Sequence, residues 1–281
     1  MGVRRAVELA CMELDKTPKS KVFALGHLIH NPQALNDLKR RNLETIDEAE
    51  LPENFDNAIV IIRAHGVNPM LEKELHNRGA QVIDATCPIV KANQLKAASL
   101  AKAGYHLFIA GDKSHAEITG ILGVCRALPN SENACIPEIV NSASMAEKSA
   151  KKLFLKCTDA KTALIGQTTI SAEEYSSIGN AIARYFPCLE ITQTLCSAVK
   201  ERQDSLRELA GKVDAIIVAG GKESANTKSL YDIAKTSGRP CILVETARDI
   251  PPEFYNFKTI GLSAGTSTPD SVIAEIEKAI N

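Results

Sequence analysis

The sequence predicts an α/β fold in which three similar lobes of parallel sheet, each flanked by helices, surround a common centre. Two observations support this prediction. Short apolar, β-branched runs alternate with amphipathic segments of helical length, which is typical of parallel sheets covered by helices. In addition, a cysteine stands twice where a predicted strand gives way to a helix, in Asp-Ala-Thr-Cys87-Pro and in Gln-Thr-Leu-Cys196-Ser.

The predicted strands and helices alternate along nearly the whole chain. Runs rich in β-branched and other apolar residues predict strands at residues 21–25, 58–62, 81–83, 107–110, 163–165, 189–192, 215–219, 241–244 and 259–262. Amphipathic segments, several with Pro, Ser or Thr near their starts, predict helices at residues 2–15, 32–41, 69–78, 89–103, 115–125, 171–185, 197–210, 226–236 and 269–280.

Three strand-to-helix units predict the three lobes. The segment Gly-Val-Arg-Arg-Ala-Val after Met1 resembles the two helix starts that follow a cysteine, but neither a strand nor a cysteine precedes it. We therefore expect lobes at about residues 1–86, 87–192 and 193–281, related by a pseudo-threefold arrangement, with the first lacking its N-terminal strand and cysteine. Ligands of open parallel sheets bind beyond the carboxyl ends of the strands, so the functional residues are expected there.

Composition excludes several classes of function. The chain is 44% hydrophobic and 24% charged, with a formal net charge of -1, which is typical of a globular protein. No run of four or more Lys or Arg residues and few aromatic residues are present, which argues against nucleic-acid binding. The longest apolar stretches are far shorter than the roughly 20 residues of a membrane-spanning helix, and the N-terminus lacks a secretory signal pattern. A soluble cytoplasmic protein is expected.

The cysteines are dispersed along the chain and form no C-x-x-C pair of the kind found in zinc ribbons or thioredoxin-type sites. In a reducing cytoplasm most of them are expected to be free thiols. Cys87 and Cys196 differ from the other six by their place at a helix start, where partial positive charge and free N–H groups favour a thiolate that can bind metal.

Histidines follow three of the predicted strands. They stand in Gly-His27-Leu-Ile-His30-Asn, in Arg-Ala-His65-Gly-Val, and in Gly-Asp-Lys-Ser-His115-Ala-Glu117. His115 and Glu117 suit a proton-delivering couple, and they equally suit a helix cap; two ligands at this spacing do not complete a metal site.

Small hydroxyl and amide groups follow other strands, in Gly-Gln-Thr168-Thr, in Gly-Gly-Lys222-Glu-Ser224-Ala225-Asn226-Thr, and in Ser-Ala-Gly-Thr-Ser267-Thr268-Pro269-Asp. We expect Ser267 or Thr268 to cap a helix that holds Pro269 in its first turn. Together with the histidines, these loops indicate a site for a phosphate or diphosphate, although ordinary N-capping explains each loop alone. No Walker motif or G-x-G-x-x-G fingerprint is present, which argues against ATP and NAD.

Seven motifs in order carry a resemblance to a known family. They are H-x-x-H-N, A-H-G-V, D-A-T-C-P, H-x-E, Q-T-T-x-S, the cysteine before E-R-Q, and A-G-x-S-x-P-D. With these motifs the chain resembles 4-hydroxy-3-methylbut-2-enyl diphosphate reductase, the last enzyme of the non-mevalonate isoprenoid pathway, from Gly2 almost to Asn281.

The resemblance implies a cofactor and a reaction. In this family three lobes each contribute one cysteine to a central [4Fe-4S] cluster, and Cys87 and Cys196 match two of these ligands. The family's first ligand lies in a Gly-Phe-Cys-x-Gly-Val segment, so the third cysteine is expected immediately before Met1. The implied reaction is the reductive dehydroxylation of (E)-4-hydroxy-3-methylbut-2-enyl diphosphate to isopentenyl and dimethylallyl diphosphate, with reduced ferredoxin or flavodoxin as the electron donor.

The resemblance also implies roles for single residues. Glu117 matches the proton donor, and Thr168 and His115 match the polar network around the substrate hydroxyl. The diphosphate positions correspond to His30, His65, Ser224, Asn226 and Ser267. Ala225 departs from the family, which often has a serine there, so only its backbone N–H is expected to contribute.

An alternative from another class is a cluster-free diphosphate-binding or regulatory protein, inactive because the first cluster cysteine is absent. The enzyme is the preferred interpretation, because Glu117, Thr168 and the anion-binding loops are all present and a binding protein would not need a proton donor.

Overall fold

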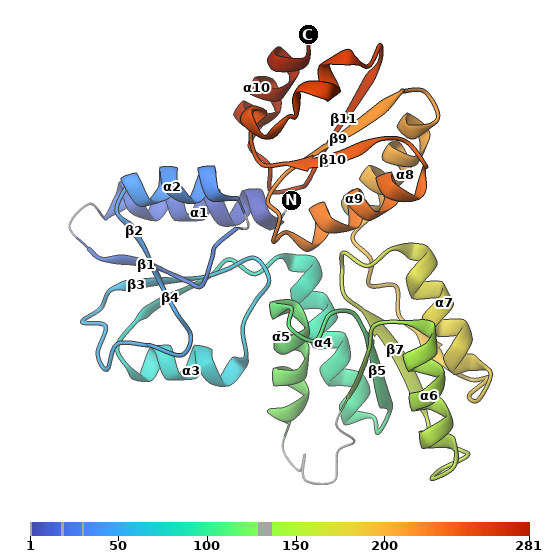
Figure 1. Cartoon of the computed structure of the whole chain (residues 1–281). Helices are drawn as coiled ribbons and strands as arrows, with labels where there is room; N and C mark the ends of the chain where they lie inside the picture. The colour runs from blue at the N-terminus through green and yellow to red at the C-terminus, as the bar shows by residue number, and fades with distance from the viewer. Residues whose placement is uncertain (1, 18–19, 30, 129–136) are drawn as a thin grey trace.

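The computed structural model describes residues 2–17, 20–29, 31–128 and 137–281. It contains three separate sheets, and every strand pair in them is parallel. Each sheet is covered by helices, and the three lobes meet near the start of the chain (Figure 1). The fold is therefore the predicted α/β architecture of three helix-covered parallel sheets.

The first lobe has the strand order β2-β1-β3-β4. Its elements are α1 (Gly2–Lys16), β1 (Val22–Leu25), α2 (Pro32–Arg40), β2 (Leu43–Ile46), β3 (Ile59–Ile62), α3 (Pro69–Asn77) and β4 (Gln81–Asp84). The central strands β1 and β3 are buried on both faces, as continuous apolar runs require. One face packs on Ala6 and Ala10 of α1, and the other on Leu75 of α3.

The second lobe has the strand order β6-β5-β7-β8. Its elements are α4 (Pro88–Lys102), β5 (His106–Ala110), α5 (Ala116–Arg126), β6 (Glu138–Val140), α6 (Ala143–Phe154), β7 (Thr162–Gly166), α7 (Ala172–Ala183) and β8 (Glu190–Ile191). Leu107 and Ile109 of β5 pack among α4 and α5, whereas Phe108 packs with α6 and α7 on the opposite face. This is the alternation of side chains along a strand.

The third lobe has the strand order β10-β9-β11. Its elements are α8 (Ser197–Ala210), β9 (Ala215–Ala219), α9 (Ala225–Thr236), β10 (Cys241–Val244), the 3₁₀ helices η2 (Ala247–Asp249) and η3 (Pro252–Asn256), β11 (Ile260–Ala264) and α10 (Asp270–Ile280). Apolar residues of α8 and α9 cover one face, and those of α10 and η3 cover the other. The strands of the three sheets lie within the ranges expected for the three lobes, but the exact lobe boundaries stay a prediction.

Every predicted strand and helix is present, with ends within two residues of those expected. Within the described residues the prediction missed the strands β2 and β6, the helix α6 and the short 3₁₀ helices η2 and η3. Strand β2 was missed because it lies at a sheet edge and two of its four residues are exposed. Strand β6 has only three residues. Helix α6 is amphipathic and begins after a capping serine, Ser142, so its sequence carries a helix signal that the prediction missed.

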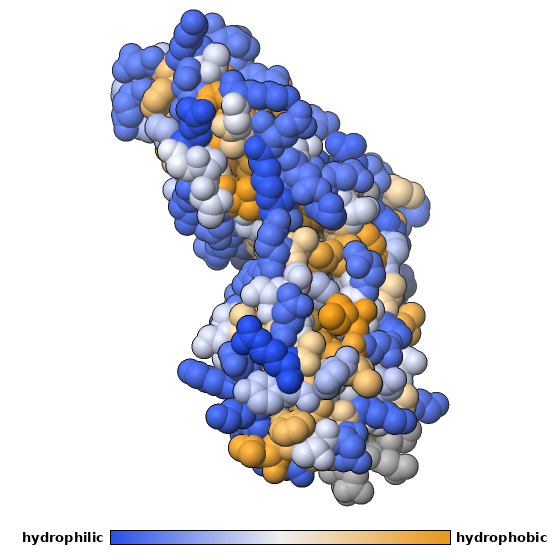
Figure 2. Space-filling view, turned by 90° about the vertical axis from the view of Figure 1, so that its right-hand side faces the viewer, coloured by the Kyte–Doolittle hydropathy of each residue, from blue (hydrophilic) through white to orange (hydrophobic). Residues whose placement is uncertain are grey.

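The surface shows no large apolar area on the face seen in Figure 2, where apolar groups form separate small patches among hydrophilic ones. The outline narrows at mid-height on this face, between the upper and lower parts of the molecule. Within the described ranges no helix has the length and apolar character needed to cross a membrane.

Tyr175 connects α7 to the sheet of the second lobe through hydrogen bonds. Its buried hydroxyl bonds the carbonyl oxygens of Leu164 at 3.0 Å and Thr192 at 2.7 Å, and burial raises its pKa to about 12. We expect Tyr175→Phe to lower the free energy of unfolding by about 1 kcal/mol, because the two buried carbonyls lose a donor. Urea unfolding would measure this, with Tyr255→Phe as the exposed control. Equal midpoints for the two variants would contradict the role of the hydroxyl.

Candidate active site

A small cavity of about 80 Å³ lies where loops of the three lobes meet. The chemically active groups at its wall are those of Cys87, Cys196, His65, His115, Thr168, Thr169, Ser224, Asn226, Thr266 and Ser267. Most follow the carboxyl end of a strand or begin a helix, where parallel sheets place ligand-binding residues. The predicted residues from distant parts of the sequence are thus brought together.

The two cysteines occupy equivalent positions. Cys87 is the N-cap of α4 and Cys196 is the N-cap of α8, and neither side chain caps its own helix. Their backbone N–H groups donate to the carbonyl oxygens of Ala64 at 2.9 Å and Thr168 at 3.1 Å. Both thiols are half-buried and line the same cavity, so both are available for a ligand.

The start of α1 abuts Cys87. A Cβ atom built on Gly2 would lie 2.4 Å from the Cβ and 2.6 Å from the Sγ of Cys87. Only glycine therefore fits this approach. Nearby, Arg5 donates from its guanidinium to the carbonyl oxygen of Thr86 at 3.0 Å, which fixes α1 against the residue before Cys87.

Glu117 lies in the first turn of α5 and is 0% exposed. Its two carboxyl oxygens accept hydrogen bonds from the backbone N–H of Thr168 at 3.0 Å and from the Thr168 hydroxyl at 2.9 Å. Burial raises the pKa of Glu117 to about 7, although hydrogen bonds from Thr168 and Asn93 act against the shift. The carboxyl stands behind Thr168, which itself lines the cavity, and it can hold a proton near neutral pH.

His115 has the helix-cap role that the sequence left open, and its part in proton delivery stays a prediction. It is the N-cap of α5, where its Nδ1 accepts from the backbone N–H of Glu117 at 3.2 Å, and its ring also lines the cavity. Because Nδ1 accepts a hydrogen bond, the proton of the neutral ring is carried by Nε2. The ring of His65 packs edge-on against it, with 5.0 Å between the ring centroids.

Ser224 and Asn226 form a polar wall at the start of α9. Ser224 is the N-cap, and its hydroxyl accepts from the backbone N–H of Thr227. Asn226 is only 4% exposed, yet within the described part of the chain neither its amide nitrogen nor its amide oxygen has a hydrogen-bond partner. The Ser267 hydroxyl is likewise buried and has no hydrogen-bond partner within the described residues. Buried polar atoms without a protein partner at a helix N-terminus are suited to an anionic ligand.

One local expectation was wrong. Neither Ser267 nor Thr268 caps α10, because the N-cap is Pro269 and no side chain caps this helix. The hydroxyl of Thr268 instead donates to the carbonyl oxygen of Ala219 at 3.0 Å, across to the end of β9. This bond leaves the neighbouring Ser267 facing the cavity. His30, which was expected at the diphosphate, lies outside the described residues.

Asn93 is a site residue that sequence reasoning missed. It is buried in α4, donates to the carbonyl oxygen of Thr194 at 3.2 Å, and hydrogen-bonds Glu117. A signal was present, because Asn93 falls on the apolar face of α4 between Val90 and Ala97. A buried amide on an apolar helix face requires a polar partner.

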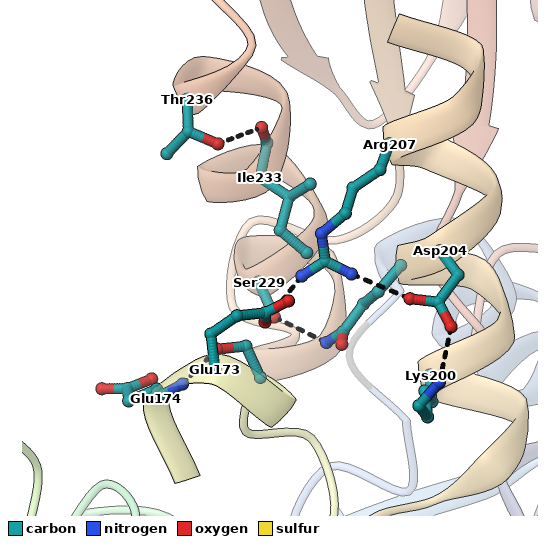
Figure 3. A network of polar contacts seen from close by, with 10 residues as sticks. Glu173, Glu174, Lys200, Asp204, Arg207, Ser229, Ile233 and Thr236 are labelled. Carbon is teal, nitrogen blue, oxygen red and sulfur yellow. Dashed lines mark hydrogen bonds and ion pairs between the residues drawn. The ribbon is translucent and has the colours of Figure 1, made fainter. Parts of the chain in front are cut away.

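A larger cavity of about 600 Å³ lies beside the first, between the second and third lobes, and shares Thr169 and Ala225 with it. Arg207 of α8 donates to Glu173 of α7 at 2.7 Å and to Asp204 at 3.0 Å. Figure 3 shows the guanidinium between these two carboxylates, with Lys200 on the other oxygen of Asp204. The Arg207–Glu173 pair joins the two lobes, whereas the thiols line the smaller cavity and the buried carboxyl lies behind its wall.

Comparison with known proteins identifies the family to which the chain belongs. The family described as "LytB protein" matches residues 1–281. The chain belongs to this family. A protein of Treponema denticola named 4-hydroxy-3-methylbut-2-enyl diphosphate reductase is 38% identical to it over 99% of this chain and 94% of its own length. A relative of the same name from Aquifex aeolicus is 35% identical over 99% of this chain and 91% of its own length.

Two solved structures share the fold. That of the E-1-hydroxy-2-methyl-but-2-enyl-4-diphosphate reductase from Plasmodium falciparum has a TM-score of 0.87 at 26% identity, covering 100% of this chain and 83% of that one. A second, titled as (E)-4-hydroxy-3-methyl-but-2-enyl diphosphate reductase, has a TM-score of 0.69 at 36% identity, covering 100% of this chain and 94% of that one. The LytB chain described here is accordingly an enzyme of the oxidoreductase class.

Proposed function

We propose that this LytB protein removes the hydroxyl group of (E)-4-hydroxy-3-methylbut-2-enyl diphosphate by reduction. The observation that carries the proposal is the chain of contacts from Glu117 through Thr168 to Cys196. The carboxyl that holds a proton near pH 7 is hydrogen-bonded to Thr168, whose carbonyl oxygen accepts from the N–H of Cys196. These contacts support the proposal, because they connect a carboxylic acid suited to proton donation with a residue whose thiol lines the cavity.

The cofactor proposed for this site is a [4Fe-4S] cluster. Among residues 2–17, 20–29, 31–128 and 137–281, no three His, Cys, Asp or Glu side chains gather closely enough to hold a single metal ion. Two thiols at helix N-caps on one cavity fit the thiolate ligation of an iron-sulfur cluster, so Cys87 and Cys196 would hold it. When bound, the cluster would supply electron transfer and a site for the substrate hydroxyl.

The overall reaction consumes two electrons and two protons for each substrate. The allylic carbon–oxygen bond breaks, the hydroxyl leaves as water, and a new carbon–hydrogen bond gives isopentenyl or dimethylallyl diphosphate. Reduced ferredoxin or flavodoxin is proposed to supply the electrons. The protein supplies protons at the Glu117 carboxyl, with the hydroxyl of Thr168 beside it to orient the leaving group.

The polar wall opposite the second lobe is assigned to the diphosphate. The amide of Asn226 and the hydroxyl of Ser267 are buried and have no hydrogen-bond partner among the residues that the structure describes, and Ser224 precedes the N-terminal turn of α9. Hydrogen-bond donors and the positive end of a helix both stabilise a diphosphate anion. Ala225 would contribute its backbone N–H alone. His65 and His115 line the same cavity and their rings pack edge-on, and His65 is proposed to contact the diphosphate as well.

Anaerobic reconstitution of the full chain with iron and sulfide tests the proposal. The reconstituted protein should show sulfide-to-iron charge-transfer absorption and, with a chemical reductant, convert the allylic diphosphate to the two products detected by NMR. Cluster formation without turnover would reject the reaction. Substrate binding without iron uptake would instead favour the alternative of a cluster-free diphosphate-binding protein.

Replacing Asn226 by Ala should raise the KM for the substrate by about tenfold or more, because a hydrogen bond to a charged group contributes about 1.5–3 kcal/mol. Thermal stability should stay nearly unchanged, since both amide atoms lack protein partners within the described residues. Steady-state kinetics and thermal unfolding would measure both effects, with the exposed Asn180→Ala as the control. An unchanged KM would remove Asn226 from the binding site.

A further inference from the structure

Helix α4 differs in charge from α1 and α8, two other helices that begin at the cavity. It carries three lysines, Lys91, Lys96 and Lys102, and no acidic residue. In contrast, α1 and α8 each carry three basic and three acidic residues. The helix that follows Cys87 is therefore the basic one of the three.

The exposed side of α4 also carries apolar groups. Ile89 is 37% exposed and Leu95 is 65% exposed, and Ala92 lies between them on the same stripe at a spacing of three residues. Lys91 is exposed beside them. We name the four residues Ile89, Lys91, Ala92 and Leu95 the α4 face. Exposed apolar residues next to basic groups are typical of a protein-docking surface.

The α4 face lies one helical turn or less from Cys87 at its near end. Cys87 caps the helix, Val90 lines the cavity, and Ile89 next to it is exposed to solvent. The first turn of α4 thus has one side in the active-site cavity and the other side on the surface. A partner seated on the α4 face would be close to the thiol of Cys87.

The charges around the α4 face favour an acidic partner. Lys91 is paired with Asp84 at 3.0 Å and Lys96 with Glu190 at 2.7 Å, yet both lysine side chains remain more than 40% exposed. Arg5 is also exposed and lies close by, since it donates to the carbonyl oxygen of Thr86. Half-exposed pairs of this kind exchange partners at little cost, so the lysines can meet acidic groups of another protein.

We propose that the α4 face is the docking surface for a small acidic electron-carrier protein. The proposal rests on the proposed function, because it assigns the route by which electrons reach the site. Each docking event would transfer one electron and leave the carrier oxidised by one electron. Two successive events would supply the two electrons that break one carbon–oxygen bond, while the two protons come from the protein and water.

Binding of the full chain to an acidic plant-type [2Fe-2S] ferredoxin tests the proposal directly. By titration calorimetry at low salt, Leu95→Glu and Lys91→Glu should each raise the Kd by about tenfold or more, because a central contact of the interface is lost. The matched controls are Leu155→Glu, at a leucine that is 78% exposed, and Lys151→Glu on α6. Added salt should weaken binding of the unaltered chain by screening the opposite charges.

The proposed docking surface would be rejected if the Kd were unchanged in Leu95→Glu and Lys91→Glu. It would also be rejected if the two control variants raised the Kd equally. Turnover provides a second readout. The α4-face variants should lose rate when ferredoxin is the reductant and keep it with reduced methyl viologen, a small dye that needs no docking surface. A reconstituted unaltered chain that is inactive even with the dye would reject the proposed reaction, while the calorimetric result would still decide the docking surface.

Discussion

Replacing Glu117 by Gln should lower the rate of turnover by about 100- to 10,000-fold, the contribution typical of a positioned general acid. The amide has nearly the same shape and can still contact Thr168, so the fold and the thiols of the site should be preserved. The loss arises because an amide has no proton to give near neutral pH. Single-turnover kinetics with a chemical reductant would measure it.

The pH profile gives the same hypothesis an independent check. Since burial raises the pKa of Glu117 to about 7, the acid form prevails below that pH and turnover should fall about tenfold per pH unit above it. The free energy of unfolding should also decrease as the pH rises. Between about pH 4.5 and 7 the folded chain keeps a proton that the unfolded chain releases, so stability declines as pH rises through this range. Glu117→Gln should remove this decline.

The matched control is Glu174→Gln, at an exposed carboxyl in the neighbouring cavity. It should leave both turnover and the pH profile close to those of the unaltered chain. A Glu117→Gln variant that retains full turnover would rule out this carboxyl as the proton donor, whatever the control does.

The second large effect concerns the thiols. Cys87→Ser and Cys196→Ser should each reduce iron incorporation by at least about 10- to 100-fold, the loss already caused by removing only an outer partner of a metal ligand. Serine keeps the size of the side chain, and neither thiol caps its helix, so the folded structure should persist. Iron and sulfide analysis, visible absorption and circular dichroism would separate loss of the cluster from loss of the fold.

Cys188→Ser serves as the control, because Cys188 is exposed and lies away from the residues that line the cavity. Equal iron content in Cys188→Ser and the two site variants would show that iron uptake does not depend on Cys87 and Cys196.

Most of the fold could be predicted because its central strands are continuous apolar runs, as in β9, where all five residues are buried. The sequence signal is weak where burial is partial, as in β2, or where a strand has only three residues, as in β6. The gathering of Cys87, Thr168 and Asn226 at one point could be expected from their positions after strands. The resemblance to a known family supplied their roles.

Other features of the site depend on tertiary contacts that no local sequence pattern indicates. No sequence pattern indicates that Thr268 turns to the carbonyl of Ala219 rather than capping α10, because both arrangements satisfy a threonine hydroxyl. The contact of Asn93 with the loop before Cys196 spans a hundred residues of sequence. The burial that raises the pKa of Glu117 likewise depends on residues distant in sequence, such as Thr168 and Asn93, that pack around it.

Thr168 has a consequence for how the site can vary. Through its backbone N–H and hydroxyl it holds the Glu117 carboxyl, and through its carbonyl oxygen it holds the N–H of Cys196. The Glu117 carboxyl and the backbone of Cys196 are thus hydrogen-bonded to the same residue, so a change in the position of Thr168 affects both. A shift of α8 that moves Thr168 would also change the hydrogen bonds that Glu117 accepts, so the proposed proton donor and the proposed cluster ligand depend on the position of one residue.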